Sequence, residues 1–156
     1  MDNKNLKTYW NAFPDFSWSH LLLRIPLAVV FIQQGLSKFP FDPAMGAAFG
    51  LPKLIWWVVA YGEIAAGVGL LAGGLASLNK IRDIPFVAEF GDLTTRFSGI
   101  TICSISTGVI WVVNKPESLI HIILYDNLHV FLWVGGLYFA LRGNWAASIA
   151  VNNKLK

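Results

Sequence analysis

An apolar run over residues 51–78 is the feature that most constrains the fold of this chain. The run is longer than the about 20 residues that an α-helix needs to cross the hydrocarbon core of a bilayer. Glu63 lies in its middle, roughly 13 Å along a helix that begins at Leu54, because each residue adds about 1.5 Å. An ionised carboxylate at that depth costs about 3 kcal/mol. The fold must therefore give Glu63 a cationic partner or a proton.

The composition is typical of a membrane protein, with 55% hydrophobic and 13% charged residues in a chain of 156. Four windows have the composition of spanning helices: 18–39, 54–78, 94–113 and 127–141. The last window is short, and Arg142 is expected to extend it by reaching the interface. We predict an all-α bundle of four transmembrane helices over residues 18–142. An interfacial N-terminal tail, 1–17, precedes the bundle, and a C-terminal tail, 143–156, follows it.

Residues 79–93 are predicted to form a linker on the inner surface of the membrane, between two helix pairs. Pro85 and the mixed charges of this stretch argue against a spanning segment. Asp92 or Thr94 is expected to cap the third helix.

The basic residues predict the orientation of the bundle. Four spans place the N-terminal tail, the second loop and the C-terminal tail on one side. That side carries Lys4, Lys7, Arg24, Lys80, Arg82, Arg96, Arg142, Lys154 and Lys156, whereas the other carries only Lys38, Lys53 and Lys115. The excess predicts that both termini are cytoplasmic. We expect the protein in the cytoplasmic membrane of a bacterium or archaeon. No basic motif indicates a nucleic-acid partner.

Polar residues of all four predicted helices converge in one layer of the outer half of the bundle. The layer comprises Gln33, Gln34, Gly35, Lys38, Glu63, Trp111, Asn114, Asp126, Asn127 and His129. Lys38 is the favoured partner of Glu63, because an unpaired carboxylate in hydrocarbon costs more than a paired one. Asp126 and His129 are three residues apart and share a helix face, which favours a carboxylate and imidazole relay. Near the inner surface, Arg24 is expected to snorkel toward lipid phosphate or a partner.

The motifs narrow the possible chemistry. His129 lies within the fourth predicted span, whereas His20 is at the inner side of the first and His121 lies in the outer loop. The single cysteine, Cys103, allows no internal disulfide. Haem, metal and nucleotide motifs are missing from the sequence, so a redox reaction would use a borrowed cofactor. A quinone fits, because it dissolves in lipid and needs only an apolar slot with a few donors. Gln34, Lys38 and His129 are candidate donors, with Glu63 or Asp126 as proton acceptor. Alternatively, these groups satisfy one another as a buried network that fixes helix register.

Two stretches, RIPLAVVFIQQGLSKF (24–39) and GLPKLIWWVVAYGEIAAGVGLLAGGL (50–75), resemble the DoxX/DoxD family of small four-helix membrane proteins. The resemblance extends over residues 22–141 and includes an acidic residue at the start of the last helix. Its pattern consists of Arg24, the Gln34, Gly35 and Lys38 group, and the E-x-x-x-G of Glu63 and Gly67. Gln34 stands where the family often has a histidine, so a group that titrates near neutral pH is missing there.

The resemblance implies a subunit of a quinone-linked redox system, similar to the large subunit of a thiosulfate:quinone oxidoreductase. If the chain is part of an enzyme, it is then a quinone-dependent oxidoreductase subunit that acts on a small sulfur compound such as thiosulfate. In that role Lys38 holds an anion, Glu63 handles a proton or organises Lys38, and Arg24 is structural, in contact with quinone or lipid. Expected partners are membrane lipid and either other membrane subunits or further copies of the chain. A non-catalytic accessory subunit and a small transporter gated by Glu63 and Lys38 are the alternatives.

Overall fold

The computed structural model describes residues 19–76 and 84–144, and within them every regular element is a helix. The elements are α2 (Ser19–Leu36), α3 (Pro43–Ala48), α4 (Lys53–Ala76), α6 (Pro85–Gly108), the π-helix Val109–Asn114 that continues α6, α7 (Leu119–Tyr125) and α8 (Asn127–Arg142). The predicted all-α class is confirmed. The predicted tail 1–17, most of the tail 143–156 and most of the predicted linker lie outside the described residues.

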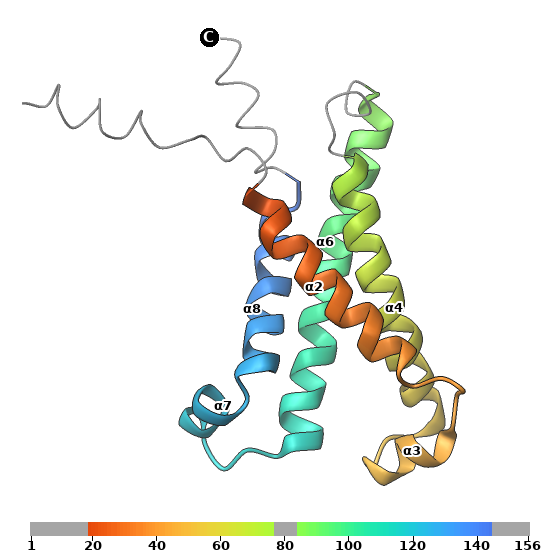
Figure 1. Cartoon of the computed structure of the whole chain (residues 1–156), viewed down its shortest axis with the longest axis vertical. Coiled ribbons are helices and arrows are strands. Elements are labelled where there is room, and N and C mark those ends of the chain that lie inside the picture. The colour runs from red at the N-terminus through yellow and green to blue at the C-terminus, as the bar shows by residue number, and fades with distance from the viewer. Residues whose placement is uncertain (1–18, 77–83, 145–156) are drawn as a thin grey trace, which may run out of the picture.

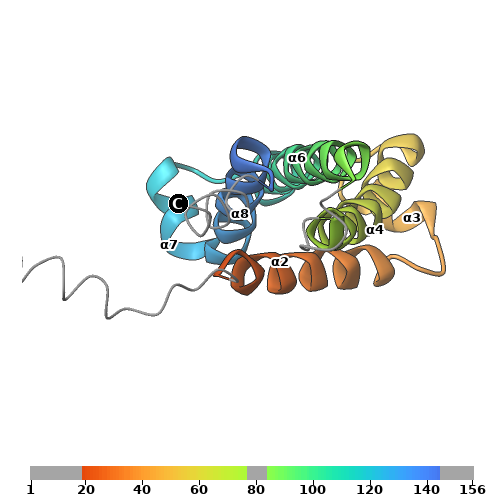
Figure 2. The same cartoon turned by 90° about the horizontal axis from the view of Figure 1, so that it is seen from above.

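The long helices α2, α4, α6 and α8 form an antiparallel bundle (Figure 1). Neighbours along the chain pack on each other, α2 on α4, α4 on α6 and α6 on α8. The start of α2 and the end of α8 lie at one end of the bundle, which we call the Arg24 end. The short helices α3 and α7 lie at the other, the α3/α7 end (Figure 1). Viewed from above, α2 and α6 lie on opposite sides, with α4 and α8 between them (Figure 2).

Two helical stretches are long and apolar enough to cross a membrane, α4 and residues 86–114. Taken together, α7 and α8 are also long and apolar enough to cross a membrane, although the pair is bent by 100° at the break between the two helices. α2 is apolar but shorter. Two or three candidate spans among the described residues indicate a multi-pass membrane protein in contact with lipid. Four complete spans and cytoplasmic termini stay predictions.

The third long helix begins earlier than predicted. α6 starts at Pro85 and includes residues 85–93, which were expected to belong to the linker. Proline is well tolerated at the first helical position, because the N–H that it lacks has no partner there. Asp92 and Thr94 therefore lie inside α6 and do not cap it. Asp92 instead pairs with Arg96, at 2.6 Å, and the Thr94 hydroxyl donates to the carbonyl of Phe90, at 2.7 Å.

The helices pack through small residues around a small core. The core consists of Leu27, Ala28, Phe31, Ala66, Leu70, Ile102, Leu132 and Phe139. A Cβ added to Gly99 of α6 would lie 2.6 Å from the carbonyl oxygen of Gly136 in α8, so the two backbones touch. Large apolar side chains such as Leu54 and Phe97, 71% and 68% exposed, face outward. Small residues at the contacts between helices, together with an apolar outer surface, are the pattern of a bundle solvated by lipid.

Candidate functional site

Two glycines set the contact between α2 and α4. A Cβ added to Gly35 would lie 2.9 Å from a backbone carbonyl oxygen of α4, and one added to Gly67 would lie 2.7 Å from a carbonyl oxygen of α2. No larger side chain fits at either position, so the two helices cross with their backbones in contact. Lys38 follows Gly35 by three residues and Glu63 precedes Gly67 by four. Because Gly35 packs against α4 at Ala60 and Ile64, Glu63 lies at the level of Gly35, where the long Lys38 side chain reaches it.

Lys38 and Glu63 form an ion pair at that level, as the sequence predicts. The Nζ atom of Lys38 lies 2.5 Å from Oε2 of Glu63 and also donates to the carbonyl of Gln34, at 3.0 Å. The Glu63 side chain is 3% exposed and that of Lys38 is 14% exposed. The ammonium group also lies 5.4 Å from the centre of a Trp56 ring. The carboxylate is thus buried but paired, which removes most of the cost of placing it in an apolar helix.

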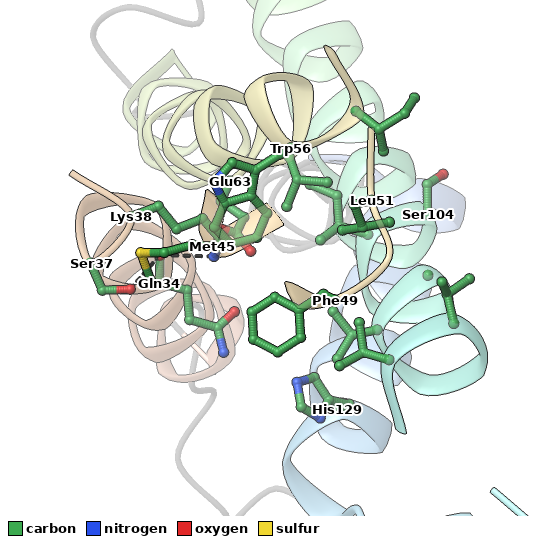
Figure 3. A pocket seen from close by; sticks show the side chains of 17 residues that line it. Gln34, Ser37, Lys38, Met45, Phe49, Leu51, Trp56, Glu63, Ser104 and His129 are labelled. Carbon is green, nitrogen blue, oxygen red and sulfur yellow. Dashed lines mark hydrogen bonds and ion pairs between the residues drawn. The ribbon is translucent and has the colours of Figure 1, made fainter. Parts of the chain in front are cut away.

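A cavity of about 540 Å³ adjoins the ion pair (Figure 3). This volume lies within the range of about 300–1,000 Å³ that is common for small-molecule sites. Its walls come from α2, α3, α4, α6 with its π-helix, and α8, and most of the lining is apolar. Four polar residues that the sequence analysis named as candidates line the cavity together: Gln34, Lys38, Glu63 and His129.

A second polar pair, His129 with Asp126, extends from the cavity wall. Nδ1 of His129 lies 2.5 Å from Oδ1 of Asp126, and the other oxygen of Asp126 accepts a hydrogen bond from the Asn114 amide, at 2.7 Å. Asp126 lies at the break between α7 and α8, outside both helices. Burial raises the pKa of its carboxyl, but hydrogen bonds from His129 and Asn114 outweigh burial and hold the pKa below its usual range.

Asp126 and Asn114 also line a second, smaller cavity of about 170 Å³ at the α3/α7 end. His129 faces the large cavity, whereas its partner Asp126 faces the small one. The predicted carboxylate and imidazole pair is therefore present and bridges two cavities. A proton held by His129 has an acceptor within hydrogen-bond distance on the side away from the large cavity.

Arg24 does not lie where the sequence analysis expected it. Its side chain is 1% exposed and donates to the carbonyl of Leu70 at 2.5 Å, to Thr95 at 3.1 Å and to Asn144 at 2.8 Å. The guanidinium also lies 4.6 Å from the centre of the Phe139 ring. It is buried and does not line the large cavity, and its expected contact with lipid or quinone stays a prediction. The carbonyl and side-chain acceptors hold it inside, which leaves the structural role that the family resemblance implied.

Other members of the predicted polar layer do not meet at the site. Trp111 is 52% exposed, and the Asn127 amide bonds to a carbonyl of α7. Conversely, the prediction omitted Met45, Phe49 and Trp56, which line the cavity. The sequence indicates these residues only by their position. Met45 and Phe49 lie between the two helices that carry the motif, and Trp56 lies at the start of the second of these helices.

The fold and the site define a small helical membrane protein with a buried ion pair beside a mainly apolar cavity. A family model described as DoxX matches residues 19–81, so this part of the chain is similar to DoxX proteins. The matched region contains α2, α3 and α4, and hence Arg24, Gln34, Lys38 and Glu63. His129 and Asp126 lie outside it. No curated protein and no solved structure matches the chain.

Proposed function

We propose that the large cavity binds the headgroup of a membrane quinone and that the protein is a membrane subunit of a quinone-linked redox system. The observation that carries this proposal is the cavity of about 540 Å³ on which both the Lys38–Glu63 pair and His129 lie. Polar groups that only fix helix register pack against one another without leaving such a space, since protein interiors are close-packed. The family match supports the redox link, because DoxX proteins are often associated with redox systems.

The residues present fit a quinone ring. The apolar lining includes Ile55 and Val59 of α4 and Val112 of the π-helix, and these side chains can cover the faces of a flat apolar ring. The ring oxygens need hydrogen-bond donors, and Lys38 and His129 supply them. Lys38 has three N–H groups, of which Glu63 and Gln34 occupy two.

When bound, a quinone supplies a carrier that takes up electrons and protons together. In this arrangement Lys38 orients a ring oxygen, and the Glu63 carboxylate keeps Lys38 in place and is a proton acceptor close to the ring. His129 acts as the second proton-handling group, and Asp126 fixes its orientation and stabilises its charged form. The polar groups are distributed over two sides of the cavity, on α2 with α4 and on α8.

We further propose that a small sulfur compound such as thiosulfate is the electron donor, at the α3/α7 end. Support comes from the family resemblance and from the basic residues Lys53 and Lys115, which flank the helices at that end. Lys38 itself is neutralised by Glu63, so an anion is expected to bind outside the cavity.

Binding of quinone analogues to the purified protein tests this function directly. The protein in lipid nanodiscs would be titrated with short-chain ubiquinone and menaquinone analogues, and quenching of its tryptophan fluorescence followed. We expect saturable quenching, weakened at least about tenfold by Glu63→Gln or Lys38→Met, which corresponds to one charge-assisted hydrogen bond. Lys53→Met is the matched control, because Lys53 is exposed at the start of α4 and does not line the cavity. No saturable binding by the wild type would refute the proposal.

A non-catalytic accessory subunit is the second candidate, favoured by the surface of α7. Leu119, Ile120, Ile123 and Leu124 of this helix are all 60–68% exposed at the α3/α7 end. Apolar side chains that cluster in this way typically contact lipid or a partner protein. Isolation from native membranes in mild detergent distinguishes the two functions. A stable complex that assembles equally well with Glu63→Gln and shows no quinone binding would favour the accessory role.

A further inference from the structure

We infer that the large cavity is filled sideways from the bilayer, through an opening between α2 and α8 that Phe49 closes. The occupant is then a membrane-dissolved molecule with a neutral, hydrogen-bonding headgroup and an aliphatic tail that stays in lipid. This inference rests on the proposed quinone function and specifies the entry route and the shape of its ligand.

The first step is that α2 and α8 touch at one level and then diverge. Near the Arg24 end, a Cβ added to Gly135 of α8 would lie 3.1 Å from the side chain of Leu27, so the two helices are in contact there. Toward the α3/α7 end, α2 instead follows α4, with which it shares its long contact (Figure 1). Gln34 and Ser37 of α2 and His129 of α8 consequently line the cavity from opposite sides.

The second step is that the α3 segment covers the cavity near the ion pair. Met45 of α3 and Leu51 of the following loop line it there. α3 is seated firmly, because a Cβ added to Gly46 would lie 2.6 Å from the Trp56 side chain. Asp42 caps the helix by accepting a hydrogen bond from the backbone N–H of Ala44, at 2.8 Å. A ligand from water would have to displace this seated helix.

The third step is the position of Phe49. Its ring lies between Gln34 and His129 in the close view of the cavity (Figure 3). The ring contacts Trp56, with centroids 5.9 Å apart, and is nevertheless 45% exposed. Gly50 follows with φ +72°, a conformation that favours glycine, and nothing lies within 4 Å of a Cβ added there. Phe49 is thus a large, half-exposed side chain on the cavity wall, next to a backbone position with free space around it.

The last step concerns the chemistry of the occupant. The polar end of the cavity holds a lysine and a glutamate that neutralise each other, so a neutral headgroup with acceptor oxygens is favoured over an anionic one. The remaining walls are mainly apolar. An aliphatic tail that leaves past Phe49 would pass between exposed apolar side chains such as Leu36 of α2 and Leu128 of α8, 55% and 50% exposed. Such side chains lie in lipid and solvate a tail without cost.

Binding kinetics in nanodiscs test the route, with a long-chain quinone analogue that carries a photoreactive group at the tail end. We expect Phe49→Ala to speed both association and dissociation by about three- to tenfold, the factor for one lost aromatic contact. Phe97→Ala is the matched control, because Phe97 is 68% exposed on α6 and does not line the cavity. In the wild type, irradiation should label α2 and α8 beside the opening.

The outcomes separate the route from the function. Labels on α3 or on the outer face of α4, together with unchanged kinetics in Phe49→Ala, would overturn lateral entry while quinone binding stands. Binding that is equally tight for a tailless analogue, after correction for partition into lipid, would also overturn it. Failure of the wild type to bind any analogue would overturn the proposed function and, with it, this inference.

Discussion

Removing Lys38 while keeping Glu63 is the perturbation whose outcome the structure constrains most tightly. Lys38→Met leaves a carboxylate whose side chain is 3% exposed without the cation that lies 2.5 Å from it. Breaking a buried pair in this way costs about 3–5 kcal/mol. The reverse change, Glu63→Gln, leaves an ammonium group that is 14% exposed and keeps its bond to the Gln34 carbonyl. We expect it to cost only about 1–2 kcal/mol, as for one lost hydrogen bond.

Proton uptake by Glu63 sets an upper limit on the Lys38→Met effect. A carboxyl that titrates near pH 4.3 in water can be protonated at pH 7 for about 4 kcal/mol, and at pH 5 for about 1 kcal/mol. The loss of unfolding free energy in Lys38→Met should therefore be about 3–4 kcal/mol at pH 7 and shrink by about 2–3 kcal/mol at pH 5. In the double variant Lys38→Met with Glu63→Gln no charge is buried, so most of the loss should be recovered.

Reversible unfolding in mixed micelles measures these differences, with circular dichroism as the signal. Lys53→Met, an exposed change of the same chemistry, should lie within about 0.5 kcal/mol of the wild type at both pH values. The reasoning is refuted if Lys38→Met is no less stable than Glu63→Gln at pH 7. A double variant as unstable as Lys38→Met would equally refute it, because the loss would then not come from an unpaired buried charge.

Three further predictions concern the frame around the site. Arg24→Lys should lower the unfolding free energy by about 2–4 kcal/mol, because an ammonium group cannot reproduce the hydrogen bonds of the planar guanidinium to its buried acceptors. Arg142→Lys, a change at an exposed residue, should have little effect in the same unfolding experiments. Gly99→Ala should cost about 1–3 kcal/mol by forcing α6 and α8 apart, whereas Gly108→Ala, with nothing within 4 Å, should be neutral or gain up to about 1 kcal/mol. Because the pKa of Asp126 is lowered, its contribution to stability is present above about pH 4 and lost as the pH falls further. Asp126→Asn should remove that part of the acid sensitivity in the same melts.

The ion pair could be predicted from sequence because the cost of burying Glu63 leaves few solutions. An acid inside a long apolar run needs a partner at its own depth, and Lys38 is the cation that an antiparallel hairpin of the first two helices supplies there. The Asp126 and His129 pair followed from helical spacing alone, since side chains three residues apart share a face. Both predictions depend on local geometry and on one strong energetic penalty.

The features that the sequence did not predict depend on long-range packing. Arg24 was expected at the interface, but its hydrogen-bond acceptors come from α4, from α6 and from Asn144, which is 120 positions away along the chain. Because these acceptors lie inside the bundle, the Arg24 side chain points inward and does not snorkel to water. The start of α6 was placed too late because Pro85 was taken as a helix breaker, whereas it occupies the first helical position. Phe49 lies in a connecting loop, where periodicity carries no information about burial.

The glycine contacts help to decide what the ion pair is for. Gly35 and Gly67 already fix how α2 lies on α4, because a Cβ at either position would meet backbone atoms of the other helix. The register of this hairpin therefore does not require a buried salt bridge, which is in general weak evidence for stability. The same crossing directs α2 along α4 and away from α8, and the cavity lies where those two helices diverge. A pair that the fold does not need for register, placed on the wall of a cavity that the crossing creates, therefore supports the proposal that this cavity binds a ligand.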